Sequence, residues 1–477
     1  MSESCSTSQR GLVQADIDAS CRVPLLILFC GASLWLLVAA VAGVLASMSF
    51  HKPDMFADKM WLSYGRILPF AKTALIYGFC LPAGMGIALW LAARLSQAKL
   101  AGGFISVVAA KLWNLGVFIG AFGILCGAST GYEGFEIPRY AGVLLFVASL
   151  LFGFVALLTI HRRAEKQLYP SQWFIIGAVF WFPWILSTAL CLLSTAPVRG
   201  VTQAVVHYWY LNNLQFVVLG LLGLGALFYF VPKLAGKDLH SRYLALFTFI
   251  TLIAFGSWVG IPEGGPLPAW MGVVSGVAAL FALAPALSVV ENLRHTCCIK
   301  AAAPEAKFFS LASLFFLVAS VLNMVGALPN LTRQLDFTLF RAAQSQVLVL
   351  GFFGMVALGG IYHILPRVAG MAWQRPALVR LNFWVAVLGV VFIALPFLVG
   401  GWQQGAKLAQ PSVAFLDIAK GTLMPIRMAS LGETLWAISA LLLTVNVFSL
   451  VIARVRASAK PFVAEITTSV TAAEVKP

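Results

Sequence analysis

Few polar side chains interrupt the long apolar stretches of this chain, and those few are its candidates for chemistry. His207 and Asn212 lie in the stretch 204–237, AVVHYWYLNNLQFVVLGLLGLGALFYFVPKLAGK. Gln344 and Gln346 lie two residues apart in a later stretch. Imidazole and amide groups inside an apolar helix either bind a metal or cofactor or hydrogen-bond to a neighbouring helix, because an unpartnered polar group is costly in a bilayer.

The spacing of these residues favours the second role. His207 precedes Asn212 by five residues, which places it more than one helical turn away and rotated by about 140°. We therefore expect His207 to make an interfacial hydrogen bond rather than to bind a cofactor. Gln344 and Gln346 are about 200° apart around a helix, so they can face different pockets. We expect each amide to bridge neighbouring helices, a contact that contributes about 0.6 kcal/mol on average in membrane bundles.

Three charged residues are further candidates for a polar site. Glu263 lies in the turn GIPEGG, Glu136 lies in GYEGFEIP, and Lys72 follows Ala71 in GRILPFAKTA. Ionisable groups near membrane depth are costly and often functional. The structural alternative for Glu263 and Glu136 is a carboxylate on the outer face of the protein. For Lys72 it is a side chain that extends to the membrane interface.

The composition identifies the class of protein that positions these residues. Of the 477 residues, 61% are hydrophobic and 10% are charged, and the mean hydropathy is +0.92. Soluble domains lie far from these values. The sequence predicts an all-α polytopic membrane protein, since continuous apolar stretches exclude the alternating pattern of a β-barrel.

Twelve apolar stretches are long enough to cross a bilayer. They are 23–49, 68–95, 106–128, 139–161, 171–195, 204–232, 242–261, 268–290, 307–328, 341–366, 379–400 and 430–453. We expect one twelve-helix membrane domain over 23–456, with polar tails at 1–22 and 457–477.

Most lysines and arginines lie in the tails and in alternate loops, so the positive-inside rule predicts that both termini are cytoplasmic. The net charge of +15 is then mainly a topology signal, and we expect no nucleic-acid partner because no soluble basic module is present.

Two predicted loops carry distinctive residues. The connection 401–429 contains Gly401, Gly405, Pro411, Gly421 and Pro425, which is turn chemistry, so we expect a loop packed on the outer face. Cys297 and Cys298, in a predicted cytoplasmic loop, are expected to be reduced and unpaired. The eight cysteines form no C-x-x-C-H motif, which excludes covalently attached c-type heme on this chain.

Several motifs follow one another along nearly the whole chain. They are GRILPFAKTA, GYEGFEIP, KQLYPSQWFIIGA, WYLNN, FYFVPKLAGKDLHSRYLAL, GSWVGIPEGGPLPAW and DFTLFRAAQSQVLVLGFFGMVALGGIYHILPR. In their letters and their order they resemble subunit I, the catalytic subunit, of the cbb-type cytochrome c oxidases of the heme-copper oxidase superfamily. WYLNN, for example, is similar to the family's W-Y-G-H-N, with Asn212 in place of the histidine.

The resemblance implies a twelve-helix bundle that, in the family, holds two b-type hemes, one copper ion and a calcium ion. It places the family's heme ligands on Ala71, Gln344 and Gln346, its copper ligands on Asn212, Pro262 and Glu263, its cross-linked tyrosine on Gly256, and a glutamate beside the calcium on Glu136. None of the six ligand-equivalent positions is a histidine. Alanine and proline side chains donate nothing to a metal, and amides are weak substitutes for imidazole. We therefore expect no heme, copper or other metal and no catalytic residue.

Three functional hypotheses follow. We favour a degenerate paralogue without heme or copper, a pseudoenzyme that acts as a structural or regulatory component of a respiratory membrane complex. The first alternative is an active terminal oxidase, reducing oxygen with electrons from cytochrome c, or a nitric oxide reductase, with unusual ligands. The second is an ion or solute conduit through the emptied cofactor cavities, because protein interiors keep such voids only when they are lined for water, lipid or ligand.

The resemblance also implies a location and partners. We expect a multi-pass protein of the bacterial inner membrane, in contact with the lipid bilayer. Oxidase relatives dock single-span cytochrome c-type subunits, so a similar single helix is the expected protein partner.

Overall fold

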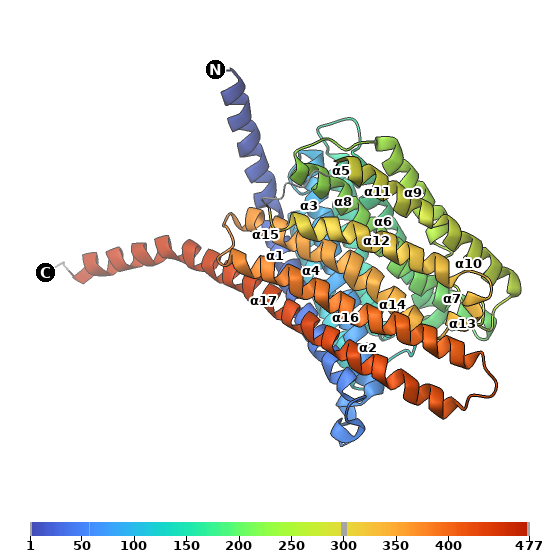
Figure 1. Cartoon of the computed structure of the whole chain (residues 1–477). Coiled ribbons are helices and arrows are strands. Elements are labelled where there is room, and N and C mark those ends of the chain that lie inside the picture. The colour runs from blue at the N-terminus through green and yellow to red at the C-terminus, as the bar shows by residue number, and fades with distance from the viewer. Residues whose placement is uncertain (1, 57, 297–302, 475–477) are drawn as a thin grey trace.

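The chain folds into a helical bundle. The computed structural model describes residues 2–56, 58–296 and 303–474, and all regular structure in these ranges is helical. Eleven helical segments in the described ranges are long and apolar enough to cross a membrane. They run side by side through one bundle (Figure 1). The prediction of an all-α polytopic membrane protein is confirmed.

The elements follow in chain order. The first half holds α1 (Ser2–Met48), the short 3₁₀ turns η1 (Pro53–Phe56) and η2 (Met60–Leu62), α2 (Tyr64–Thr73), η3 (Ala74–Cys80), α3 (Leu81–Ser96), α4 (Gly103–Leu125), α5 (Arg139–His161), α6 (Pro170–Ala189), η4 (Leu190–Thr195), α7 (Val201–Asn212), η5 (Asn213–Val218) and α8 (Leu219–Ala235). The second half holds α9 (Arg242–Gly256), α10 (Ala269–Phe281), α11 (Leu283–Thr296), α12 (Ala306–Gly326), α13 (Leu331–Leu335), α14 (Leu339–Gln346), η6 (Val347–Gly354), α15 (Met355–Ala369), α16 (Pro376–Leu408) and α17 (Phe415–Glu474). The elements η3, η4, η5 and η6 are π-helices that continue the α-helices before them.

The predicted seventh span, 242–261, is shorter in the structure than the sequence suggested. It corresponds to α9, which has 15 residues and ends at Gly256. At 1.5 Å per residue this helix is about 22 Å long, less than the roughly 30 Å of a bilayer core. The apolar residues after Gly256 enter a turn in which Gly260 adopts a positive φ of 85°, so they do not extend the helix.

Three spans form the centre of the bundle. In the most apolar part of Tyr64–Ser96 and of Val201–Ala235, 94% of the residues are buried, and in Leu339–Ala369 all are. The corresponding share in the eight other spans of the described chain is 33–50%. Helices that are apolar on every side belong in the interior, whereas the outer helices keep one face for lipid. All four ligand-equivalent residues that lie on spans are on these three.

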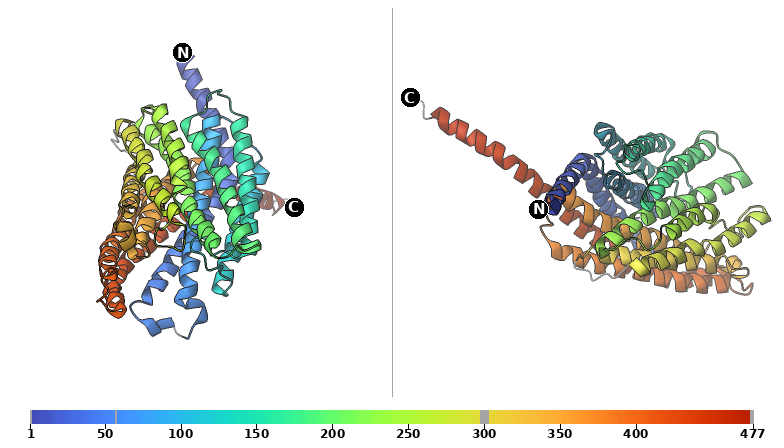
Figure 2. Two further views of the ribbon diagram at one scale, coloured as in Figure 1. Left: turned by 90° about the vertical axis from the view of Figure 1, so that its right-hand side faces the viewer. Right: turned by 90° about the horizontal axis from the view of Figure 1, so that it is seen from above.

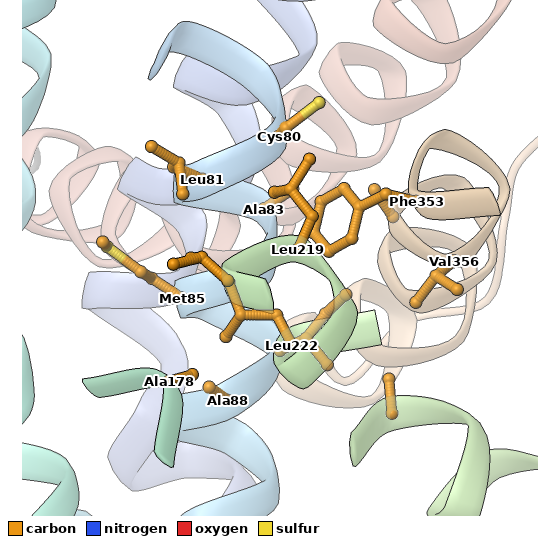
Figure 3. Packing of buried hydrophobic residues seen from close by; sticks show 14 of the residues in the cluster. Cys80, Leu81, Ala83, Met85, Ala88, Ala178, Leu219, Leu222, Phe353 and Val356 are labelled. Carbon is orange, nitrogen blue, oxygen red and sulfur yellow. The ribbon is translucent and has the colours of Figure 1, made fainter. Parts of the chain in front are cut away.

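Close contact between the central spans depends on small residues. At Gly84 in α3, a Cβ atom would lie 2.9 Å from both Leu222 Cδ1 and Phe353 Cζ. Figure 3 shows this part of the core, where Leu219 and Leu222 of α8 and Phe353 of η6 meet the segment that carries Ala83. The three spans are therefore held in one fixed mutual arrangement by interlocked apolar side chains.

The predicted loop 401–429 is mostly helical, which is a correction. Helix α16 continues to Leu408 and α17 begins at Phe415, so only six residues form the turn between them. The glycines serve close packing rather than chain reversal. A Cβ atom at Gly401 would overlap the backbone of Leu339 and Phe340, and one at Gly405 would overlap the backbone of Gln334. The two long helices form a hairpin along one side of the bundle (Figure 1).

The polar terminal segments are also helical. Helix α1 begins at Ser2 and α17 ends at Glu474, so each terminal helix continues beyond the apolar stretch that was predicted within it. Both helices project from the rest of the bundle (Figures 1 and 2). Cys21, Cys30, Cys80, Cys126 and Cys191 are free thiols. Cys297 and Cys298 lie outside the described residues.

The close approach at Gly401 gives a stability test. Replacing Gly401 with alanine forces a methyl group into the backbone of α14, and overpacking of this kind costs about 1–3 kcal/mol. We expect Gly401→Ala to lower the melting temperature of the detergent-solubilised protein. Gly65→Ala is the matched control, because a Cβ at Gly65 in α2 meets nothing within 4 Å. Equal melting temperatures for the two variants would contradict the packing role of Gly401.

Candidate functional site

Each central span contains a π-helical segment that begins beside its ligand-equivalent residue. Segment η3 starts three residues after Ala71, η5 starts directly after Asn212, and η6 starts directly after Gln346. A π-helix adds a residue to the helical turn and is frequent at functional sites. It also shifts the direction of the side chains on either side of it. At all three positions the backbone therefore departs from a regular α-helix.

Three of the ligand-equivalent side chains meet in one cavity. The cavity has a volume of about 350 Å³ and contains Asn212, Pro262 and Gln344 in its wall. We refer to it as the Asn212 cavity. Its other lining residues are Glu133, Tyr208, Leu211, Gln215, Phe216, Gly260, Asn323, Asp336, Phe337, Thr338, Arg341, Ala342, Ser345 and Leu348. The volume is within the range of about 300–1,000 Å³ that is usual for small-molecule sites.

The amides of this cavity are hydrogen-bonded to helix backbones. Asn212 Nδ2 donates to the carbonyl oxygen of Gly256 at 2.8 Å. Gln344 Nε2 donates to the carbonyl oxygen of Leu322 in α12 at 2.5 Å. Each bond joins two different helices, which satisfies the amide N–H group inside the bundle.

An ion pair that the sequence analysis did not identify holds the wall of the Asn212 cavity. Asp336 Oδ1 lies 2.6 Å from Arg341 Nη2, and the Asp336 side chain is only 2% exposed. Arg341 Nη1 also donates to Gln344 Oε1 at 3.1 Å. Asp336 Oδ2 accepts the backbone N–H of Glu263 at 3.0 Å, so the same carboxylate anchors the turn that carries Pro262. Arg341 and Gln344 are three residues apart in α14, a spacing that brings side chains together on a helix, and this was the available signal; Asp336 precedes the helix.

The second cavity lies beside the first. It has a volume of about 210 Å³ and includes Gln346, Lys72 and Glu433 in its wall. We refer to it as the Gln346 cavity. The residues Glu133, Gln215, Ala342 and Ser345 line both cavities. Ser345 Oγ and Gln215 Oε1 are 3.0 Å apart in a hydrogen bond between the central spans, and this pair lies where the two cavities adjoin.

The two glutamines face different cavities, as their spacing predicted. Gln344 lines the Asn212 cavity and Gln346 lines the Gln346 cavity. Their bonding differs. Gln344 uses both of its polar atoms, whereas Gln346 Oε1 is buried and has no hydrogen-bond partner.

The other two ligand-equivalent residues, Ala71 and Glu263, do not line either cavity. Ala71 is buried in a small apolar cluster with Ala42, Ala46 and Ile67. Glu263 is on the surface, with Oε1 3.8 Å from Arg333 Nε and a side chain that is 37% exposed. Gly256 contributes only its carbonyl oxygen, and a Cβ atom there would lie 3.0 Å from the ring of Phe216. A phenol at this position would therefore require Phe216 to move.

A polar cluster adjoins the cavities at the 126–138 loop. Lys72 Nζ donates to Glu133 Oε1 at 2.6 Å, and His207 Nε2 donates to the Glu133 carbonyl oxygen at 3.0 Å. Burial raises the pKa of Glu133, but the Lys72 ammonium, its hydrogen bond and His207 outweigh this effect and hold the pKa below its ordinary value. Lys72 is therefore joined to the loop, and His207 joins the start of α7 to the same loop.

Glu136 is the most perturbed carboxyl group of that loop. Its side chain is 4% exposed, and Oε2 is buried without a hydrogen-bond partner. Burial raises the pKa of Glu136 to about 7, against the opposing effects of backbone N–H groups and of Lys72. Nearby, the hydroxyl groups of Tyr77 and Tyr210 share a hydrogen bond, and Tyr77 donates to the carbonyl oxygen of Gly134 at 2.7 Å. Glu136 thus lies at a junction between the loop and two central spans.

Sequence reasoning found only part of this arrangement. It identified six positions as a set, and four of them, Asn212, Pro262, Gln344 and Gln346, line the two cavities, whereas Ala71 and Glu263 do not. It missed other polar residues of the walls, such as Gln215, Asp336, Arg341 and Glu433. Glu433 was the most visible omission, because a carboxyl group near the start of a long apolar stretch is itself a signal of a site. Within residues 2–56, 58–296 and 303–474, no three His, Cys, Asp or Glu side chains are grouped as metal ligands would be.

Comparisons with known proteins agree over most of the chain. Residues 24–457 match the family described as Cytochrome C and Quinol oxidase polypeptide I. The cbb3-type cytochrome c oxidase subunit CcoN1 of Stutzerimonas stutzeri is 25% identical over an alignment of 396 residues, and the match covers 78% of this chain and 81% of the relative. Cytochrome c oxidase subunit 1 of Rhodobacter capsulatus is 24% identical over an alignment of 463 residues, and the match covers 88% of this chain and 83% of the relative.

A solved structure has the same fold. It is the cryo-EM structure of a heme-copper terminal oxidase dimer, which superposes with a TM-score of 0.74 and covers 90% of this chain and 84% of the solved chain. The sequence identity is 14%, so the likeness concerns the fold alone. The predicted resemblance to subunit I of a cytochrome c oxidase and the predicted heme-copper-oxidase-like fold are confirmed.

The perturbed pKa of Glu136 gives a pH test. Because its pKa is about 7 in the folded protein and ordinarily 4.5, the folded state binds the extra proton between these values, and stability falls as the pH rises through this window. The loss amounts to about 3 kcal/mol at most. We expect Glu136→Gln to melt at a higher temperature than the unmodified protein at pH 8 and at the same temperature at pH 4.5.

Glu133→Gln is the control of opposite sign. The pKa of Glu133 is lowered, so its charged form stabilises the fold above the ordinary pKa. This variant should melt at a lower temperature at pH 8, and the difference should shrink as the pH falls below 4.5. A lower melting temperature for Glu136→Gln at pH 8 would show that the ionised form of Glu136 is stabilised in the fold, against the argument from burial.

Proposed function

The chain belongs to the cytochrome c and quinol oxidase polypeptide I family, and we propose that it is a paralogue without heme or copper that acts as a structural or regulatory component of a respiratory membrane complex. The observation that carries this proposal is the condition of the six ligand-equivalent positions. They hold Ala71, Asn212, Pro262, Glu263, Gln344 and Gln346.

The residues at the heme positions do not fit a b-type heme. A bis-imidazole site needs two strong nitrogen donors on opposite sides of the iron. Ala71 offers a methyl group within an apolar cluster, and Gln346 offers one amide oxygen. Gln344 already uses both polar atoms in bonds to Arg341 and Leu322.

The copper positions fit no better. Copper at such a site takes imidazole nitrogen, and proline has no donor atom in its side chain. The amide N–H of Asn212 donates to the carbonyl oxygen of Gly256. Glu263 forms an ion pair with Arg333 on the surface and does not line the cavity of Asn212 and Pro262. The side chains at these positions therefore support a chain without copper.

The intact scaffold supports a role as a component of a complex. The central spans keep their close packing, and in the most apolar part of each outer span at least half of the residues are not buried. In the membrane these faces contact lipid or the helices of other subunits. We propose the bacterial inner membrane as the location, with both termini in the cytoplasm, and single-span cytochrome c-type subunits as partners.

Two alternatives remain distinct hypotheses. Family membership favours an active terminal oxidase or nitric oxide reductase with unusual ligands. The polar wall of the Asn212 cavity favours an ion or solute conduit, because its volume of about 350 Å³ holds many water molecules at about 30 Å³ each.

A heme assay separates the first alternative from our proposal. We expect the protein, purified from a host that supplies heme to a histidine-bearing relative, to give a pyridine hemochrome signal far below one heme per chain. The relative, purified in parallel, is the positive control. The reduced-minus-oxidised spectrum should show no b-type bands. One or two hemes per chain would overturn the proposal.

A flux assay addresses the conduit. The protein in liposomes should conduct protons and alkali cations no faster than empty vesicles, because Gln215 and Ser345 join the spans where the two cavities adjoin and an apolar core packs around them. Flux that rises in proportion to the protein content would support the conduit and would contradict a purely structural role.

A further inference from the structure

The Gln346 cavity has the composition of a ligand site rather than of an unfilled gap. Its wall is mainly apolar, with the aromatic residues Phe50, Tyr64 and Phe397 and few polar groups. It lies among α1, α2, η3, η5, α14, η6, α16 and α17, so residues far apart in the sequence form it together. Sites for small molecules usually combine a largely apolar, aromatic wall with a few polar groups that orient the ligand.

Two oxygen atoms in this wall have no partner. Gln346 Oε1 and Glu433 Oε2 are both buried, and neither accepts a hydrogen bond. A buried acceptor without a donor costs about 1–3 kcal/mol, and more when the group is charged. Both atoms are acceptors when Glu433 is ionised, so an occupant that satisfies them must bring hydrogen-bond donors.

The charges of the wall favour a cation. The charged lining residues are one lysine, Lys72, and two glutamates, Glu133 and Glu433. Lys72 Nζ is bonded to Glu133 Oε1 at 2.6 Å. Glu433 is therefore the one carboxyl group in this wall that has no lysine or arginine of the wall paired with it. A carboxylate in a membrane interior requires a counter-charge or a proton.

We propose that the Gln346 cavity binds a small organic cation with a primary ammonium group. Its N–H groups donate to Glu433 and Gln346, and its positive charge lies near the faces of aromatic rings, which attract cations. The alkyl part contacts the apolar wall formed by residues such as Leu75, Ile76 and Val349. A volume of about 210 Å³ corresponds to about seven water-sized groups, which suits an amine of four or five carbon atoms.

This inference rests on the proposed absence of heme from the cavity, and the experiment measures both. The full-length protein is purified in detergent, and its heme content is determined first. Its melting temperature is then titrated with n-butylammonium at pH 8. We expect a saturable rise with n-butylammonium and a much smaller one with n-butanol, which lacks the charge, or with tetramethylammonium, which lacks N–H donors. Sodium chloride at equal ionic strength should produce no saturable rise.

Variants locate the site. Glu433→Gln should weaken n-butylammonium binding at least tenfold, and Gln346→Met, which keeps the size of the side chain, should weaken it several-fold. Glu291→Gln is the matched control, because Glu291 is an exposed glutamate on α11 that pairs with Arg294. If Glu433→Gln does not fold, Gln346→Met and the ligand series still decide the question.

The outcomes are separable. Stoichiometric heme would overturn both the proposed function and this inference. A protein without heme that shows no saturable response to n-butylammonium would overturn only the cation site. So would equal responses to n-butylammonium and n-butanol, or unchanged binding in both Glu433→Gln and Gln346→Met.

Discussion

Polar groups that the three central spans bury must find their partners inside the protein, because 94–100% of the residues in the most apolar part of each span are buried. This constraint explains why Asn212 and Gln344 donate to the backbones of α9 and α12, and why Gln215 bonds to Ser345. Where the requirement is met, the cavity wall is a network of hydrogen bonds. At Gln346 of the central span and at Glu433 of α17 a partner is missing, so the wall of the Gln346 cavity offers unpaired acceptors to an occupant.

The same constraint connects the cavities to the surface loops. Asp336 binds Arg341 and also the backbone of the turn at Glu263, while Lys72 and His207 both bind the loop at Glu133. These loops therefore cover the ends of the central spans through specific polar contacts. The polar groups at the ends of the buried helices need these hydrogen bonds whether or not a cofactor is bound. The fold can therefore be kept in a chain without cofactors.

Sequence reasoning recovered the fold class because hydropathy is a local signal. Hydropathy located the spans, and the resemblance brought together Asn212, Pro262 and Gln344, which share a cavity wall. It failed where residues distant in sequence decide the structure. Gly401 and Gly405 resembled turn residues until the backbone of Leu339, Phe340 and Gln334 was seen against them. Glu433 was overlooked because its importance comes from Gln346, 87 positions earlier, and from a cavity that no single segment encodes.

The π-helical segments η3, η5 and η6 bear on how such a family diverges. A π-helical turn holds one residue more than an α-helical turn, so deleting one residue from such a segment restores an ordinary α-helical turn and leaves the helix beyond it in nearly the same phase. Point substitutions at positions 71, 212 and 346 change only the side chain, whereas the loss of the additional residue would remove the widened turn beside each position. A substitution at these positions therefore exchanges the group that faces the interior while the local backbone stays as it is, so a different side chain is held in the same direction.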